Sequence, residues 1–502
     1  MTAAAYLPLF VAIPLGVAGV TAAARAHWVW PRWLLMITLA AQLVFSLLLV
    51  ASLRDGSILA HGVGRWQGGI AIPFVADMLS ALMLVVTSLL ALTCAGFALA
   101  SHPGRVRLFV PLTLALVAGV NGALLTGDIF NLFVFIEVML LPSYGLLILA
   151  KRQQGTFRSH VGSRLYVAFN LFVSTMFLVG VGLVYGVAGT VNLAELAGAA
   201  AEDHLVAIGG GVAIAALCMK AAVVPTHGWL ARAYPSTSPA ITALFSGLHT
   251  KVAIYAIYRI YAVLFDGDTR YLWIGLVLFT LTMVIGVMGA VGEATTRSIL
   301  AFHMVSQIGY ILLGVALFTP AGLAAGIFYL LHHMIVKASL FLSTGAIEER
   351  YGTNKLSVLK SRLRKEPLIA ASFLIAALSL AGLPPFSGFV AKLTLIVATV
   401  EAGHIWVAVA ALVVSLITLM SMLKIWDAVF ASSRPDEDEM PSARIRAARR
   451  LPTPAGLIIP GAALALVTLS LGLGGELLYG LSMTAAEGLM DTSGYVEAVL
   501  AP

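Results

Sequence analysis

Six side chains that can take up and release a proton lie deep inside strongly apolar stretches of this chain. They are a glutamate, a histidine and four lysines: Glu137, Lys220, Lys251, His333, Lys337 and Lys392. A charge at the centre of a membrane-spanning helix costs about 2.5–3.5 kcal/mol on insertion scales, so such residues are functional candidates by default. Carboxyl, imidazole and amine groups in this setting predict the movement of protons or other cations.

The alternative for these residues is structural ion pairing. Glu137, in GDIFNLFVFIEVMLLPSYG, could neutralise one lysine, but the other three would have no intramembrane acid partner in this chain. They would be neutral, hydrated or paired with another subunit, and we therefore favour translocation for the set. Arg259 and Lys424 lie nearer the ends of their apolar stretches, and we expect both to snorkel to the membrane interface.

Histidines accompany the lysines. His333 and Lys337 are four residues apart and therefore share a helical face, whereas His249 and Lys251 are two apart and do not. Each histidine is either a relay group or a hydrogen-bonded core residue, and the sequence leaves this open for His249, His303, His332 and His333. We expect no metal site, because no set of Cys or carboxylate ligands accompanies them.

Prolines stand close to two of the lysines. Lys220 precedes Pro225 by five residues, and Lys392 follows Pro385 by seven. Proline inside a membrane span removes a backbone hydrogen bond, which is tolerated where protein or water satisfies the freed groups. Broken helices beside ionisable residues in corresponding positions are typical of transporter sites.

The elements that position these residues must be membrane-spanning helices. Of 502 residues, 60% are hydrophobic and 11% are charged, against about 25% charged in ordinary soluble proteins. This excludes a soluble enzyme, a disordered tail and a nucleic-acid binder. The apolar runs are too long and continuous for barrel strands, so we predict an all-α polytopic membrane protein.

Fourteen spans are expected. They run near 5–23, 33–53, 73–100, 108–126, 129–150, 162–188, 206–230, 239–265, 271–292, 298–318, 322–347, 367–400, 404–431 and 455–482. The proline breaks fall in spans 7 and 12, and an odd separation inverts the second copy, so spans 4–8 and 9–13 are candidate inverted five-helix repeats. The predicted segments are 1–107, the repeats 108–265 and 271–431, and the C-terminal part 432–502.

The basic residues predict the orientation. Twenty-one lie on the side reached after span 1 and three on the other, so that side is cytoplasmic and both termini are outside. Residues 348–366 are expected to form a basic surface helix, and 433–450 a solvated cytoplasmic loop. Neither segment carries a phosphate-binding loop, a zinc-protease motif or a nucleophile elbow, so we expect a transporter rather than an enzyme.

Several strings resemble the antiporter-like family. They are LTGDIFNLFVFIEVMLLPSYGLL, MKAAVVPTHGWLARAYPSTSP, SGLHTKVAIYAIYR, FHMVSQIGY and AGLPPFSGFVAKL. The family includes the large proton-pumping subunits of respiratory complex I and the two large subunits of Mrp-type Na⁺/H⁺ antiporters. VADMLSALML and GDIFNLFVFIE are most similar to the D-type branch of the Mrp antiporters.

The resemblance implies fourteen helices, two inverted repeats, broken helices 7 and 12, and a hydrophilic axis along the membrane plane. It implies that Glu137 is the helix-5 glutamate and that Lys220, Lys251 and Lys392 are the lysines of helices 7, 8 and 12. The helix-11 group is either His333 or Lys337. The implied setting is a bacterial cell membrane, with other Mrp subunits, the lipid bilayer, H⁺ and Na⁺ as partners and no cofactor.

Three other functions compete with a Na⁺/H⁺ antiporter subunit. A proton-pumping subunit of complex I or of a membrane-bound hydrogenase would use the same axis. A membrane enzyme with a metal held by His303, His332 and His333 would need carboxylate ligands nearby, and none is apparent. A purely structural subunit would not need unpaired central lysines.

Overall fold

The computed structural model describes residues 3–25, 27–65, 71–101, 103–149, 159–359, 366–431 and 452–500. The first half contains η1 (Ala3–Tyr6), α1 (Leu9–Ala22), α2 (Trp30–Ser52), β1 (Leu59–Gly62), η2 (Val63–Arg65), β2 (Pro73–Ala76), α3 (Met78–Ala100), η3 (Pro103–Arg105), α4 (Phe109–Leu125), α5 (Ile129–Leu149), α6 (Ser159–Ala188), α7 (Ala199–Glu202), α8 (His204–Lys220), α9 (Gly228–Ala233), η4 (Tyr234–Ser236) and α10 (Pro239–Leu264).

The second half is helical throughout its described elements. It contains η5 (Thr269–Tyr271), α11 (Leu272–Gly292), α12 (Thr296–Leu317), α13 (Pro320–Tyr351), α14 (Leu356–Leu359), α15 (Pro367–Ala381), α16 (Ser387–Glu401), α17 (Ile405–Trp426), η6 (Asp427–Ala431), α19 (Ala455–Leu473), α20 (Gly475–Met490) and α21 (Ser493–Leu500). In the first half, β1 and β2 form an antiparallel pair that joins Leu59 to Ala76 and Gly62 to Pro73.

The prediction of an all-α polytopic membrane protein is confirmed. Among the described residues, eleven helices are long and apolar enough to cross a membrane, and three shorter apolar helices (α4, α8 and α15) bring the number to fourteen. Each coincides with one predicted span. Helices prevail because a bilayer offers no partner for backbone N–H and C=O groups, and a helix satisfies them internally.

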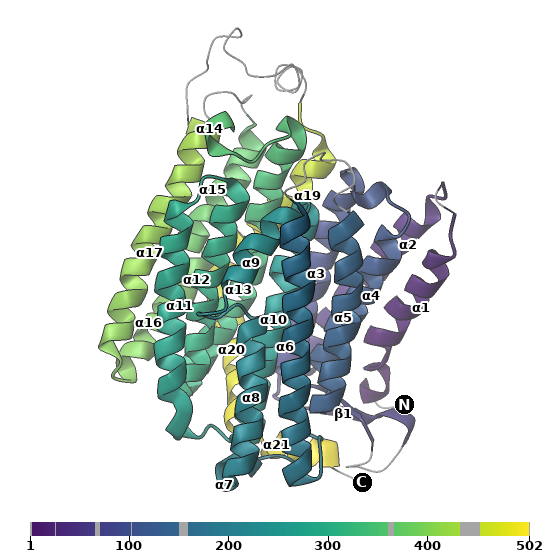
Figure 1. Cartoon of the computed structure of the whole chain (residues 1–502), viewed down its shortest axis with the longest axis vertical. Coiled ribbons are helices and arrows are strands. Elements are labelled where there is room, and N and C mark those ends of the chain that lie inside the picture. The colour runs from purple at the N-terminus through teal and green to yellow at the C-terminus, as the bar shows by residue number, and fades with distance from the viewer. Residues whose placement is uncertain are drawn as a thin grey trace.

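Two spans are interrupted where the prolines predicted it. α8 ends at Lys220 and α9 begins at Gly228, while α15 ends at Ala381 and α16 begins at Ser387. In Figure 1, α9 lies above α8 whereas α16 lies below α15, so the chain runs through the two broken helices in opposite directions. This is the arrangement expected of inverted repeats. The exact limits of the four predicted segments stay a prediction.

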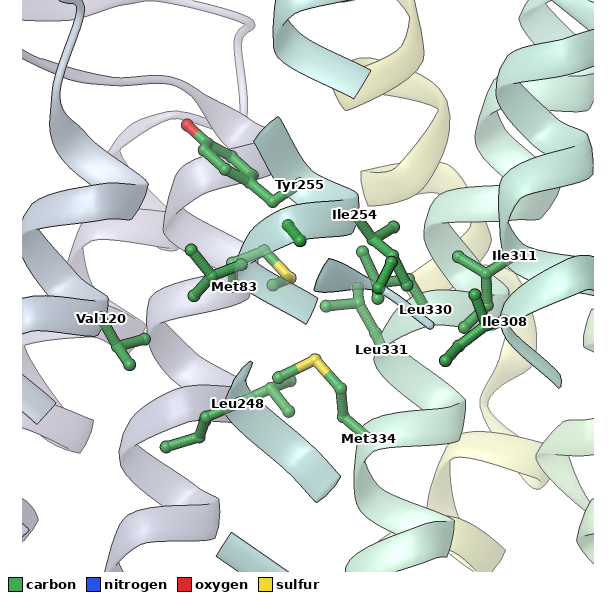
Figure 2. Packing of buried hydrophobic residues seen from close by; sticks show 14 of the residues in the cluster. Met83, Val120, Leu248, Ile254, Tyr255, Ile308, Ile311, Leu330, Leu331 and Met334 are labelled. Carbon is green, nitrogen blue, oxygen red and sulfur yellow. The ribbon is translucent and has the colours of Figure 1, made fainter. Parts of the chain in front are cut away.

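The apolar core surrounds the centre of the bundle. The apolar windows of α10 and α13 are entirely buried, whereas only a third of the α1 and α19 windows is buried. Side chains from α3, α4, α10, α12 and α13 interlock there, including Met83, Leu248, Ile308 and Met334 (Figure 2). The outer helices expose large apolar residues, as expected of a surface that meets lipid. The central helices can therefore hold polar groups away from lipid.

The segment 348–366 differs from the prediction of a basic surface helix. α13 continues to Tyr351, and Glu348 is buried in an ion pair with Arg297 of α12. Only Leu356–Leu359 form a separate helix in the described part. The prediction failed because an acid at a helix end was read as solvated, although a buried arginine neutralises it. Residues 360–365 and the predicted loop 433–450 lie outside the described residues.

Both ends of the chain lie at the same end of the bundle, beside α7 and α21 (Figure 1). An even number of membrane crossings has this consequence, in agreement with fourteen spans. α14 lies at the opposite end of the bundle.

Candidate functional site

All six predicted site residues lie on helices of the two broken-helix blocks. Glu137 is on α5, Lys220 ends α8, Lys251 is on α10, His333 and Lys337 are on α13, and Lys392 is on α16. The histidine and the lysines are buried, Lys251 and Lys337 with 0% exposure, and Glu137 is half-buried. The structure thus keeps five of the six away from solvent and lipid.

Lys220 contacts an amide rather than the predicted carboxylate. Its Nζ donates to Asn170 Oδ1 over 3.2 Å, and Asn170 Nδ2 donates to the carbonyl of Tyr166 over 2.8 Å, which turns the amide oxygen toward the lysine. Glu137 is close enough for its charge to act on Lys220. Its buried Oε1 nevertheless has no hydrogen-bond partner. The two residues interact electrostatically without a direct ion pair.

His249 connects α10 with α6 and α5. Its Nδ1 shares a hydrogen bond of 2.6 Å with Tyr166 Oη, which lies 3.0 Å from Ser143 Oγ. Lys220 acts electrostatically on this histidine. His249 Nε2 has no hydrogen-bond partner, so it is available to water or to a moving proton.

His333 lies between lysines of the two blocks. Lys251, whose Nζ donates to Thr250 Oγ1 over 3.0 Å, and Lys337, whose Nζ donates to the carbonyl of Leu300 over 2.9 Å, both act electrostatically on it. Neither ring nitrogen of His333 has a hydrogen-bond partner. The shared face predicted for His333 and Lys337 thus holds, and Lys251 approaches from the other block.

His303 continues the row toward Lys392. Its Nε2 lies 2.9 Å from Ser421 Oγ, and both Lys337 and Lys392 act on it electrostatically. Lys392 Nζ donates to Ser415 Oγ over 2.8 Å and to the carbonyl of Ala381 over 3.0 Å. Ala381 is the last residue of α15, so the ammonium stabilises the negative end of that half-helix.

His332 lies beside the same break rather than in the row itself. Its Nδ1 shares a 2.8 Å hydrogen bond with Ser387 Oγ at the start of α16. Among the residues that the structure describes, no three His, Cys, Asp or Glu side chains are grouped as metal ligands would be. The histidines face serines and lysines, which suits proton exchange.

Arg259 shows that one sequence interpretation was wrong. Instead of snorkelling to an interface, its buried guanidinium donates to Asp77 Oδ2 over 2.5 Å and lies 5.7 and 5.1 Å from the ring centres of Tyr255 and Tyr495. A nearby acid removes the reason to reach water. Lys424 behaves as expected, because it is exposed and donates to carbonyls at the end of α11.

Sequence reasoning also missed Asn170 and Tyr166. Both are polar side chains inside the predicted span 162–188, and that placement was the available signal. Their partners lie 50 and 83 residues away, so only the fold identifies them.

Comparisons with known proteins agree with this geometry. The family model described as NADH:quinone oxidoreductase/Mrp antiporter, TM, matches residues 126–418. The chain is 37% identical over 465 residues to the D-type subunit of the Na(+)/H(+) antiporter of Alkalihalophilus pseudofirmus, covering 91% of this chain and 92% of the relative.

Solved structures give the same result. A chain of the Mrp complex from Dietzia sp. DQ12-45-1b is 54% identical, with a TM-score of 0.95 and full coverage of both chains. A chain of the membrane-bound sulfane sulfur reductase, an archaeal respiratory membrane complex, is 26% identical, with a TM-score of 0.85 and 99% coverage of both.

Proposed function

The chain belongs to the NADH:quinone oxidoreductase/Mrp antiporter transmembrane family, and we propose that it is the D-type, cation-translocating subunit of a multisubunit Na⁺/H⁺ antiporter. It is a transporter subunit rather than an enzyme, and its partners are the other subunits of an Mrp-type complex. The relatives that share 37% and 54% of its residues carry these names.

Protons move along the buried row Glu137, Lys220, Lys251, His333, Lys337 and Lys392, with His249 and His303 as connecting groups. The observation that carries this proposal is His333, which interacts with lysines of both blocks while both its ring nitrogens lack hydrogen-bond partners. His333 and Lys337 both belong to the row, which replaces the choice between them by a sequence of two groups.

Charge repulsion drives the transfer. Two positive charges about 6 Å apart at an effective dielectric of about 20 repel each other by about 2.8 kcal/mol. This is roughly a hundredfold in a protonation equilibrium. Protonation of one lysine therefore favours proton release from its neighbour. Glu137 holds Lys220 charged when the two approach, and the contact to Asn170 is the separated state of this pair.

The energy source is the proton-motive force, and the basic ends of the helices are cytoplasmic. The positive-inside asymmetry of twenty-one against three basic residues supports this orientation, with both termini outside. The host membrane is that of a bacterial cell. A proton-pumping subunit of a respiratory complex is the alternative, and the lower identity to the sulfane sulfur reductase chain makes it the less favoured one.

The test compares two lysines of different depth in the assembled complex. Lys392→Ala should abolish Na⁺/H⁺ exchange in everted vesicles, because it removes the terminal buried group of the row. Lys424→Ala is the matched control and should remain near wild type, because Lys424 is exposed. Equal loss in both variants, at equal complex levels, would contradict the relay.

A further inference from the structure

A large apolar cavity lies outside the proton row, between the two blocks. It has a volume of about 730 Å³ and is lined by α8, α10, α11 and α12, and by the residues Val223–Thr226 that join α8 to α9. Its lining is apolar almost throughout, including Ile208, Ile214, Leu278 and Phe279. A cavity of this size is in the range that holds a drug-sized molecule or a lipid chain.

The cavity is open toward the surface that meets lipid. Ile208 of α8 and Ile274 of α11 both line it, and they are 56% and 41% exposed. The 17 residues of α8 extend along it for about 25 Å. One leaflet of a ~30 Å hydrocarbon core is shorter than this. An acyl chain that enters from one leaflet can therefore lie along the full cavity.

The end of the cavity near α7 is acidic. His204 lines this end, and the preceding Glu202 and Asp203 are exposed or partly exposed. Asp266 and Asp268 approach from the other loop, because Arg270 donates to the carbonyl of Ala201 and ties the two loops together. The hydrogen bond from Arg270 holds the pKa of Asp268 below its usual range, so this carboxylate stays ionised at neutral pH.

Four acids against one arginine disfavour an anionic headgroup at this end. An ammonium group has the complementary charge, and the arginine is already engaged by Asp268 over 2.5 Å. A phospholipid that carries a primary ammonium beside its phosphate satisfies both the acidic mouth and the apolar interior.

The other end of the cavity reaches the support of Lys220. Cys218 and Met219, which directly precede this lysine, line the cavity. The backbone N–H of Val224 donates to Thr282 Oγ1, and Trp229 Nε1 donates to the carbonyl of Met219. An occupant packs against the connection that fixes the end of α8.

We propose that this cavity binds one acyl chain of phosphatidylethanolamine, with the ammonium headgroup at the acidic mouth, and that the bound chain supports the broken helix that carries Lys220. The binding stands independently of transport, whereas the effect on Lys220 rests on the proposed function.

The test uses the complete complex and a matched pair of glycines. Gly211 lines the cavity and Gly186 lies on α6, and a Cβ at either position meets nothing within 4 Å. Gly211→Leu therefore fills the cavity without a backbone clash, and leucine is a better helix former than glycine. Gly186→Leu makes the same change on an exposed helix face outside the cavity.

Phosphatidylethanolamine with a photoreactive diazirine in its acyl chain is cross-linked to the complex, and the labelled peptides are mapped by mass spectrometry. We expect labels on α8 and α11 at the cavity, several-fold weaker labelling by phosphatidylglycerol with the same chain, loss in Gly211→Leu and retention in Gly186→Leu. Equal labelling by the two lipids, insensitivity to Gly211→Leu, or labels on another subunit covering the cavity would overturn the proposal.

Transport is measured in the same variants after reconstitution with and without phosphatidylethanolamine. The lipid should raise Na⁺/H⁺ exchange several-fold in wild type and Gly186→Leu but not in Gly211→Leu. Normal lipid stimulation in Gly211→Leu, with cross-linking lost, would overturn the link to Lys220. Absence of exchange in every variant, with cross-linking intact, would contradict the proposed function and leave the binding site standing.

Discussion

Replacing Asp77 by asparagine isolates the energy of one buried ion pair. Asp77 Oδ1 caps α3 by accepting from the backbone N–H of Ser80 over 2.9 Å, while Oδ2 accepts from Arg259. Asparagine is as good a helix N-cap as aspartate, so Asp77→Asn keeps the cap and removes the charge. The side chains of Asp77 and Arg259 are only 8% and 6% exposed, so the guanidinium left behind cannot reach water.

The size of the effect follows from this burial. Removing one partner of a buried pair costs about 3–5 kcal/mol. The rings of Tyr255 and Tyr495 lie beside the guanidinium and retain about 1 kcal/mol of cation–π attraction. We expect a net loss of about 2–4 kcal/mol in the free energy of unfolding.

The assay is denaturant unfolding in mixed micelles. The double variant Asp77→Asn with Arg259→Met should recover most of the loss, because removing both charges leaves none unpaired. Asp268→Asn is the matched control, since its partner Arg270 is 57% exposed and can be solvated, and it should change little. If Asp77→Asn unfolds like wild type, or the double variant loses as much as the single variants together, the pair does not stabilise this end of the bundle.

Two further variants test the row. Glu137→Gln keeps the side-chain shape but removes the charge that acts on Lys220, so exchange in everted vesicles should be lost while the complex still assembles; near-normal exchange would exclude Glu137. His333→Gln keeps a hydrogen-bonding side chain that does not titrate, so exchange should fall as far as in Lys337→Ala, and unchanged exchange would mean that protons bypass His333.

The fold was largely predictable because the bilayer restricts the options. Long apolar runs could only be helices, and Pro225 and Pro385 marked the two interruptions without knowledge of any contact. The exact end of α8 at Lys220 was not predictable, because the chain leaves the helix five residues before Pro225. A proline disfavours helix in its neighbourhood, but packing decides where the helix stops.

The site was predictable as a set of residues but not as a set of contacts. Charge at membrane depth identified the lysines and Glu137 from composition alone. Partners such as Asn170 for Lys220 and Asp77 for Arg259 are 50 and 182 residues away, and no local spacing relates them. His333 and Lys337 were related correctly because a helix fixes the neighbours at i and i+4.

Transport by Lys220→Arg tests most directly whether protons pass through the row. Arginine keeps a positive charge at the end of α8 but does not release a proton at accessible pH. The measurement is Na⁺/H⁺ exchange in everted vesicles at equal levels of assembled complex, beside wild type and Lys220→Ala. A proton relay predicts that Lys220→Arg assembles and is as inactive as Lys220→Ala. Wild-type exchange in Lys220→Arg would show that Lys220 supplies only a fixed charge, and would contradict the relay.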